Sequence, residues 1–164
     1  MPTPNVSEPV YREVAVTDPG VRVLLREYFS MRVHGFPPDQ GDYTVNLPAP
    51  DAFRPPDGVL LVAAQGGSDV GCGGIRRIPP APDGHTRWEV KHLFLRETVR
   101  GRGLGRAFLA ELERRARLAG AEELVLDTNS SLAAAGHLYT RTGFAAIEPY
   151  NDNPNADRWY GKTL

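Results

Sequence analysis

The sequence predicts an α+β domain in which helices cover both faces of a mixed sheet of about seven strands. Two observations support this prediction. Short alternating or β-branched runs recur along the whole chain, and three segments with helical periodicity or helix start and stop signals lie between them. No internal repeat and no linker interrupts the 164 residues, so we expect a single domain over 1–164.

The first third of the chain predicts a strand, a helix and a long loop. Residues 10–16 alternate and include β-branched side chains, as strands do. Asp18 and Pro19 form an N-cap and first-turn pair, and the helix that they open reaches about Val33 with its apolar residues on one face. Residues 34–58 contain six prolines. A loop of that length in a compact domain is either functional or partly helical.

The middle of the chain predicts three strands and a helix. The strands are expected at 59–64, 69–78 and 86–95, with a glycine turn joining the first two as a hairpin. The helix begins at Leu104 and ends near Ala119, before a glycine. Its apolar face repeats every four residues: Leu104, Phe108, Leu112 and Ala116.

The last third predicts a strand, a helix and two closing strands. The strand is expected at 123–128, and the helix is expected from a cap at Ser130 or Ser131 to about Arg141. The closing strands are expected at 144–150 and 157–164.

Composition excludes several classes of function. The formal net charge of −1 provides no broad positive field, so we expect no binding to nucleic acid or to membrane surfaces. No apolar run approaches the roughly 18 residues of a membrane helix. A single cysteine, Cys72, rules out an intrachain disulfide and suits the reducing cytoplasm, where we expect the protein. Cys72 lies among glycines with no histidine near it in sequence, which favours a small buried residue over a nucleophile.

The stretch VRGRGLGRAF, residues 99–108, combines three glycines and three arginines at the start of a helix. Glycine lets the backbone approach a phosphate, the first helical amides have no intrahelical partners, and arginine adds charge-assisted hydrogen bonds. The dinucleotide fingerprint is absent, because Arg106 stands where its third glycine belongs, and the G-K-[ST] of a Walker loop is missing. The plain alternative is a glycine-rich turn that only joins a strand to a helix.

Two motifs resemble the GNAT superfamily of acetyl-CoA-dependent N-acetyltransferases. Arg100-x-x-Gly103-x-Gly105, after a strand that ends LFL, resembles the acetyl-CoA pyrophosphate motif. The strand LVLDT followed by HLYTRTGF resembles the family's second motif, and YNDNP near the C-terminus resembles a bacterial subgroup. The resemblance implies a mostly antiparallel sheet that splays between strands four and five, acetyl-CoA as the cosubstrate and no metal.

The resemblance also implies where the cofactor lies. The pantetheine arm would bond to backbone groups of Leu93, Phe94 and Leu95, where one amide would polarise the thioester carbonyl. The family's asparagine seven residues before its tyrosine is replaced by Leu132, which leaves Asn129 as a candidate cofactor contact. The pyrophosphate would lie on the residues that open the helix: Arg100, Gly101, Arg102, Gly103, Leu104, Gly105 and Arg106.

Two residues match catalytic positions of the family. Tyr139 matches the tyrosine whose phenol donates a proton toward the departing sulfur; the alternative is a core tyrosine packed on Phe144. Glu89 matches the general base of the histone-acetylating branch. A base matters because a lysine-type amine of pKa about 10.4 is mostly protonated at pH 7. The alternative for Glu89 is an ion pair with Lys91 or Arg87.

Three residues are candidates for binding the acceptor. Arg76 and Arg77 could hold a carboxylate, or could be solvated residues at a strand end. His92 is expected on the opposite strand face from Glu89, because side chains alternate along a strand. At most one of these two is then expected to reach the acceptor.

The expected function is acetyl transfer to a primary amine of a small molecule by direct attack. The long loop at 34–58 is expected to cover the acceptor site, which favours a small acceptor. The alternatives are a non-catalytic acyl-CoA-binding or sensor domain and a protein or peptide acetyltransferase. Closing strands of this kind often pair between subunits in the family, so a homodimer is a further expectation.

Overall fold

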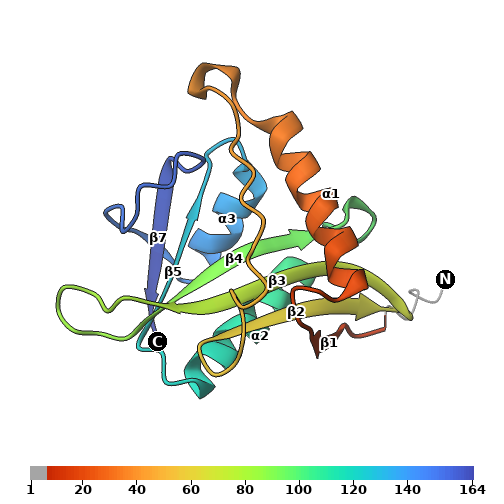
Figure 1. The fold of residues 1–164 in the computed structure, drawn as a ribbon, viewed down its shortest axis with the longest axis horizontal. Coiled ribbons are helices and arrows are strands. Elements are labelled where there is room, and N and C mark those ends of the chain that lie inside the picture. The colour runs from red at the N-terminus through yellow and green to blue at the C-terminus, as the bar shows by residue number, and fades with distance from the viewer. Residues whose placement is uncertain (1–6) are drawn as a thin grey trace.

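The computed structural model in Figure 1 describes residues 7–164 and confirms an α+β fold around one seven-stranded sheet. The sheet order is β1-β2-β3-β4-β5-β7-β6, and all neighbouring strands are antiparallel except β4 and β5, which are parallel. The strands are β1 (Val10–Glu13), β2 (Gly58–Gln65), β3 (Ser68–Ile78), β4 (Arg87–Leu95), β5 (Glu123–Thr128), β6 (Ala145–Ala146) and β7 (Arg158–Thr163).

Three helices lie at the expected places in the chain. They are α1 (Pro19–Gly35), α2 (Leu104–Leu118) and α3 (Ala133–Arg141). The predicted cap of α1 is confirmed, because the Asp18 carboxylate accepts a hydrogen bond from the backbone N–H of Val21 at 3.0 Å. Among residues 7–164, no helix is both long enough and apolar enough to cross a membrane.

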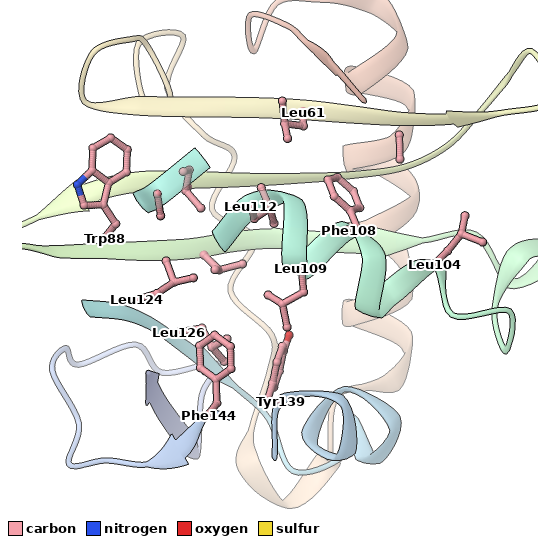
Figure 2. Packing of buried hydrophobic residues seen from close by; sticks show 14 of the residues in the cluster. Leu61, Trp88, Leu104, Phe108, Leu109, Leu112, Leu124, Leu126, Tyr139 and Phe144 are labelled. Atoms are coloured by element: carbon pink, nitrogen blue, oxygen red, sulfur yellow. The ribbon is translucent and has the colours of Figure 1, made fainter. Parts of the chain in front are cut away.

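Helices cover the two faces of the sheet unequally (Figure 1). On one face α1 packs with the inward side chains of β2, β3 and β4 in a cluster that includes Leu24, Phe29 and Val62. On the other face α2 and α3 form the larger cluster, shown in Figure 2, with Phe108 and Leu112 fully buried. Burial of each such side chain contributes about 1.5–3 kcal/mol before the entropy cost of ordering it.

Two predictions for the last third of the chain are wrong. Neither Ser130 nor Ser131 caps α3, which begins at Ala133 without a side-chain cap. The Ser130 hydroxyl instead donates a hydrogen bond to Asp157 at 2.6 Å. The strand expected at 144–150 is reduced to the two residues of β6, because Pro149 has no N–H that could donate a hydrogen bond to a neighbouring strand.

The loop between α1 and β2 is irregular, apart from a short 3₁₀ turn at Pro38–Gln40, as its proline content predicts. Two of its attachments flank residues 45–52. Thr44 exchanges two hydrogen bonds with the side chain of Asn155, at 2.9 and 2.7 Å. Phe53 is buried against β3, where a Cβ on Gly74 would lie only 2.7 Å from the phenyl ring. The glycine is therefore required for this close approach.

Candidate active site

The cleft of the molecule opens where β4 and β5 separate. These parallel strands pair only from Arg87 with Glu123 to Glu89 with Val125, and beyond that point each continues without the other. The space between them and the surrounding helices has a volume of about 1120 Å³. It is lined by both strands, α1, the proline-rich loop, the start of α2, and α3. The splay implied by the resemblance is therefore present.

A β-bulge at His92 changes which side chains face α1. Cys72 pairs with Phe94 and Gly74 pairs with Lys91, so β4 has one more residue than β3 over this span. His92 accommodates the extra residue with a φ of 55°, a conformation uncommon outside glycine.

The bulge overturns the prediction that His92 and Glu89 lie on opposite faces. The ring of His92 lies 5.4 Å from Phe29 and 5.8 Å from Phe53, on the same face where Lys91 approaches Glu89. Burial, with a smaller contribution from the charge of Lys91, lowers the pKa of His92 to about 3. The imidazole is therefore neutral at physiological pH.

At one end of the cleft, the first turn of α2 is free to accept an anion. Gly103 is the N-cap with a φ of 79°, no side chain caps the helix, and no acidic residue lies in its first turn. Gly101 also has a positive φ, and a Cβ at either glycine would meet no atom within 4 Å. Arg100 and Arg106 line the cleft beside them. The arrangement has the backbone donors and charges of a phosphate site.

The residues expected at the cofactor largely come together. The members that line the cleft are Leu93, Phe94, Leu95, Arg100, Gly101, Gly103, Gly105 and Arg106. Leu104 has its side chain in the core, so only its backbone is available. Arg102 does not line the cleft, and neither does Asn129, which is fully buried and donates to Gln40 at 2.8 Å.

Tyr139 projects from α3 into this region. Figure 2 shows its hydroxyl pointing away from α3, and the residue lines the cleft although its ring is packed on Phe144 and Tyr160. Burial raises the pKa of Tyr139 to about 12, with the charge of Arg32 opposing the rise. The phenol therefore keeps its proton at neutral pH and can act as a hydrogen-bond donor or acid.

Glu89 is buried behind the wall of the cleft. It is 1% exposed and does not line the cleft. Its carboxylate accepts hydrogen bonds from Arg76 at 3.0 Å and from the Tyr150 hydroxyl at 2.6 Å, and Lys91 Nζ lies 3.4 Å away. Arg76 and Lys91 do line the cleft, so Glu89 meets it only through them.

Asp127, at the end of β5, lines the cleft and was not singled out from the sequence. Its carboxylate accepts hydrogen bonds from Lys91 at 2.9 Å and from Asn151 at 2.7 Å. Burial alone would raise the pKa of Asp127, but Lys91 and Asn151 outweigh burial and lower it. Tyr150 and Asn151 both come from the YNDNP stretch, so that stretch fixes the two buried carboxylates.

Two other predicted positions lie outside this arrangement. Arg77 does not line the cleft, and its exposed side chain approaches Asp57 at 4.0 Å. Cys72 is fully buried, and burial raises its thiol pKa to about 12. The thiol therefore stays protonated, which fits a packing role.

The α1 side of the cleft contains residues that the motifs do not identify: Tyr28, Phe29, Arg32 and Tyr43. Arg32 carries the clearest signal in the sequence. It follows Tyr28 by four residues and Phe29 by three, so the period of the helix places a charged residue in the buried stripe.

Comparisons with known proteins agree with this geometry. The family model described as the acetyltransferase (GNAT) family matches residues 21–144. IAA acetyltransferase of Azospirillum brasilense is 32% identical over 154 residues, covering 92% of this chain and 94% of the relative.

Solved structures share the fold over nearly the whole chain. An acetyltransferase from Streptococcus agalactiae aligns with a TM-score of 0.72 at 20% identity, covering 95% of this chain and 98% of that one. A GNAT acetyltransferase from Elizabethkingia anophelis with acetyl-CoA bound aligns with a TM-score of 0.62 at 16% identity, over 95% and 98%.

Proposed function

Because the chain belongs to the GNAT acetyltransferase family, we propose that it transfers the acetyl group of acetyl-CoA to a primary amine of a small molecule. The observation that carries the proposal is the cleft at the splay, which joins an uncapped, glycine-rich helix start to a buried, protonated tyrosine. The first feature suits a diphosphate, and the second suits a thiol leaving group.

The residues at the α2 end fit acetyl-CoA. The open space over Gly101 and Gly103 leaves room for the pyrophosphate against the backbone amides of 101–106, flanked by Arg100 and Arg106. The pantetheine arm would follow Leu93–Leu95, where β4 has lost β5 as a partner. We call this the cofactor end of the cleft.

The chemistry is a direct transfer. The amine nitrogen bonds to the thioester carbonyl carbon, the carbon–sulfur bond breaks, and the nitrogen gives up a proton. Tyr139 supplies a proton to the departing sulfur and recovers one from solvent. A backbone amide near the bulge at His92 would stabilise the oxyanion, an effect worth about 10²–10³ in rate where it has been measured.

Glu89 serves this reaction at a distance. It holds Arg76 and Lys91 in place at the wall of the cleft, and the proton of the amine would leave to water in the cleft. We propose this positioning role in place of direct contact with the acceptor.

The acceptor would enter from the opposite side, which we call the acceptor end; it is lined by Arg32, Tyr43, Arg76, Lys91 and Asp127. The proline-rich loop forms one wall there through residues of 43–52. Because that wall covers one side of the cleft, we propose a small acceptor rather than a protein chain. The name of the Azospirillum relative supports acetyl transfer to a small molecule but does not identify the amine.

A thiol-release assay with acetyl-CoA and a panel of amino acids, amino-acid amides, polyamines and peptides tests the function. We expect acceptor-dependent release, with the N-acetyl product visible by mass spectrometry. Release that no amine increases would favour the sensor alternative.

Tyr139→Phe tests the proton donor in the same assay. We expect kcat to fall at least about 100-fold, the lower end of the range for loss of an acid catalyst, while the Kd of acetyl-CoA changes less than about twofold. Tyr11→Phe is the matched control, because the Tyr11 hydroxyl is buried without a partner and lies outside the cleft. An unchanged kcat for Tyr139→Phe would remove Tyr139 from the mechanism.

A further inference from the structure

Arg32 is a buried cation without a hydrogen-bonded or charged partner among the described residues. The residue is 5% exposed, yet its guanidinium donates no hydrogen bond and forms no ion pair with any residue in 7–164. Its Nε is completely buried without a partner, and the guanidinium carbon lies 5.2 Å from the centre of the Tyr43 ring. Arg32 is also among the residues that line the cleft, where a substrate would bind.

A buried charge without a partner is costly to keep. An isolated ion loses several kcal/mol of hydration that stacking on one aromatic ring restores only in part. Buried arginines are therefore normally paired with a carboxylate or phosphate. The absence of such a partner among the described residues indicates that the partner comes with the ligand.

No acid of the cleft is available to Arg32. Asp127 is the only acidic side chain among the described residues that line it, and Asp127 is held by Lys91 and Asn151. Glu89 is held by Arg76 and Tyr150 behind the wall. The other two cations of the acceptor end are thus balanced, and Arg32 alone leaves an excess of positive charge.

Arg32 also lies within electrostatic range of the reaction centre. Burial dominates the raised pKa of Tyr139, and the charge of Arg32 acts against it. The same opposition applies to the raised pKa of Tyr28. Arg32 and the phenol that we propose as the proton donor line the same cleft, so an anion held by Arg32 would share that cleft with Tyr139.

From this geometry we infer that the acceptor is an amine that also carries a carboxylate, an amino acid, and that Arg32 holds the carboxylate. The planar guanidinium matches a carboxylate through two parallel hydrogen bonds. The neighbouring walls from Tyr28, Phe29 and Tyr43 suit an apolar or aromatic side chain. The unbalanced positive charge disfavours polyamines and other polycations.

This inference rests on the proposed function, and the test uses acid and amide pairs. Phenylalanine and leucine are compared with phenylalaninamide and leucinamide, which keep the amine and the side chain but lack the negatively charged carboxylate. We expect the wild-type protein to prefer the acids by about 50-fold or more in kcat/KM. Arg32→Gln should reduce the preference to less than about threefold, and Arg32→Lys should give an intermediate value.

Arg26→Gln is the matched control, because Arg26 lies on the same helix, is exposed and does not line the cleft. It should retain the full preference for acids. The Kd of acetyl-CoA should change less than about twofold in all three variants. Because Arg32 has no hydrogen-bonded or charged partner among residues 7–164, Arg32→Gln should melt at or above the temperature of the wild type.

Several outcomes would overturn the inference and leave the function standing. These are wild-type acetylation of amides as efficiently as acids, a rise in the Kd of acetyl-CoA in Arg32→Gln, and a lower melting temperature with equal losses on acids and amides. A rise in the Kd of acetyl-CoA would assign Arg32 to cofactor binding, and the lower melting temperature with equal losses would assign it to folding stability. Acetylation of no amine, acid or amide, would overturn the proposed function and this inference together.

Discussion

The two ends of the cleft differ in their binding groups: one end presents backbone amides and the other presents side chains. At the cofactor end, the binding groups are backbone amides exposed by glycines at positive φ and by a helix without a side-chain cap. At the acceptor end, they are side chains from α1, the loop, β3, β4 and β5, fixed by the YNDNP stretch. Backbone binding needs only a short contiguous segment, whereas a side-chain site needs the whole fold.

This difference gives each end its own mode of failure. The backbone site should fail locally, through a change that alters one turn and lowers affinity without unfolding the protein. Apart from Arg32, the side-chain site should fail together with stability, because its carboxylates Glu89 and Asp127 are buried and paired with Arg76 and Lys91.

The largest expected effect is at the cofactor end. Gly103→Glu places a carboxylate where we propose that the pyrophosphate binds, and a non-glycine residue at a φ of 79° costs about 1–2 kcal/mol. We expect the Kd of acetyl-CoA, measured by calorimetry, to rise at least about 100-fold, or about 2.7 kcal/mol.

Gly84→Glu is the control for strain alone, since Gly84 has a φ of 89° and does not line the cleft. It should leave the Kd unchanged. Equal Kd values for both variants would move the phosphate site away from α2.

A smaller effect is expected from breaking the acceptor end. Asp127→Asn leaves the partly buried Lys91 with only its longer ion pair, to Glu89. It should lower the free energy of unfolding at pH 7 by about 2 kcal/mol in urea titrations, between the losses typical of a surface pair and of a fully buried pair. Asp69→Asn, which breaks a pair with Arg12 at the surface, should cost less than about 1 kcal/mol.

The pH dependence of this effect follows from the pKa of Asp127. Because the folded protein lowers that pKa, the stabilisation is present above the unfolded value of about 4 and is lost as pH falls through the folded value. The wild type and Asp127→Asn should therefore converge in stability as the pH is lowered below about 4. A constant difference between them would contradict the pairing.

The smallest effect concerns His92, whose ring should show no titration between pH 8 and about pH 4, because burial lowers its pKa to about 3. The unfolded ring binds a proton below about pH 6.5, so His92 makes the folded state less stable as pH falls from there toward 3. NMR titration of the ring protons checks this, with His92→Asn for assignment. An inflection near pH 6.5 would show that the ring is hydrated.

The cofactor end could be predicted from the sequence, whereas most of the acceptor end could not. VRGRGLGRAF is contiguous, so the cofactor end could be read from ten residues, and the amphipathic period of 104–118 located its helix within one residue. The contact of Glu89 with Tyr150 spans 61 positions and has no local signature. The bulge at His92 is also invisible locally, because a single added residue reverses the strand alternation on which the prediction depended.

The proline-rich loop has a consequence for how this protein can change. Two of its attachments, the hydrogen bonds of Thr44 with Asn155 and the buried Phe53, hold the ends of the segment 45–52, which lies mostly exposed between them. Substitutions within 45–52 alter the wall of the acceptor end without changing the sheet or the glycine-rich start of α2. New acceptor preferences can therefore arise by drift in eight surface positions while the catalytic scaffold stays intact.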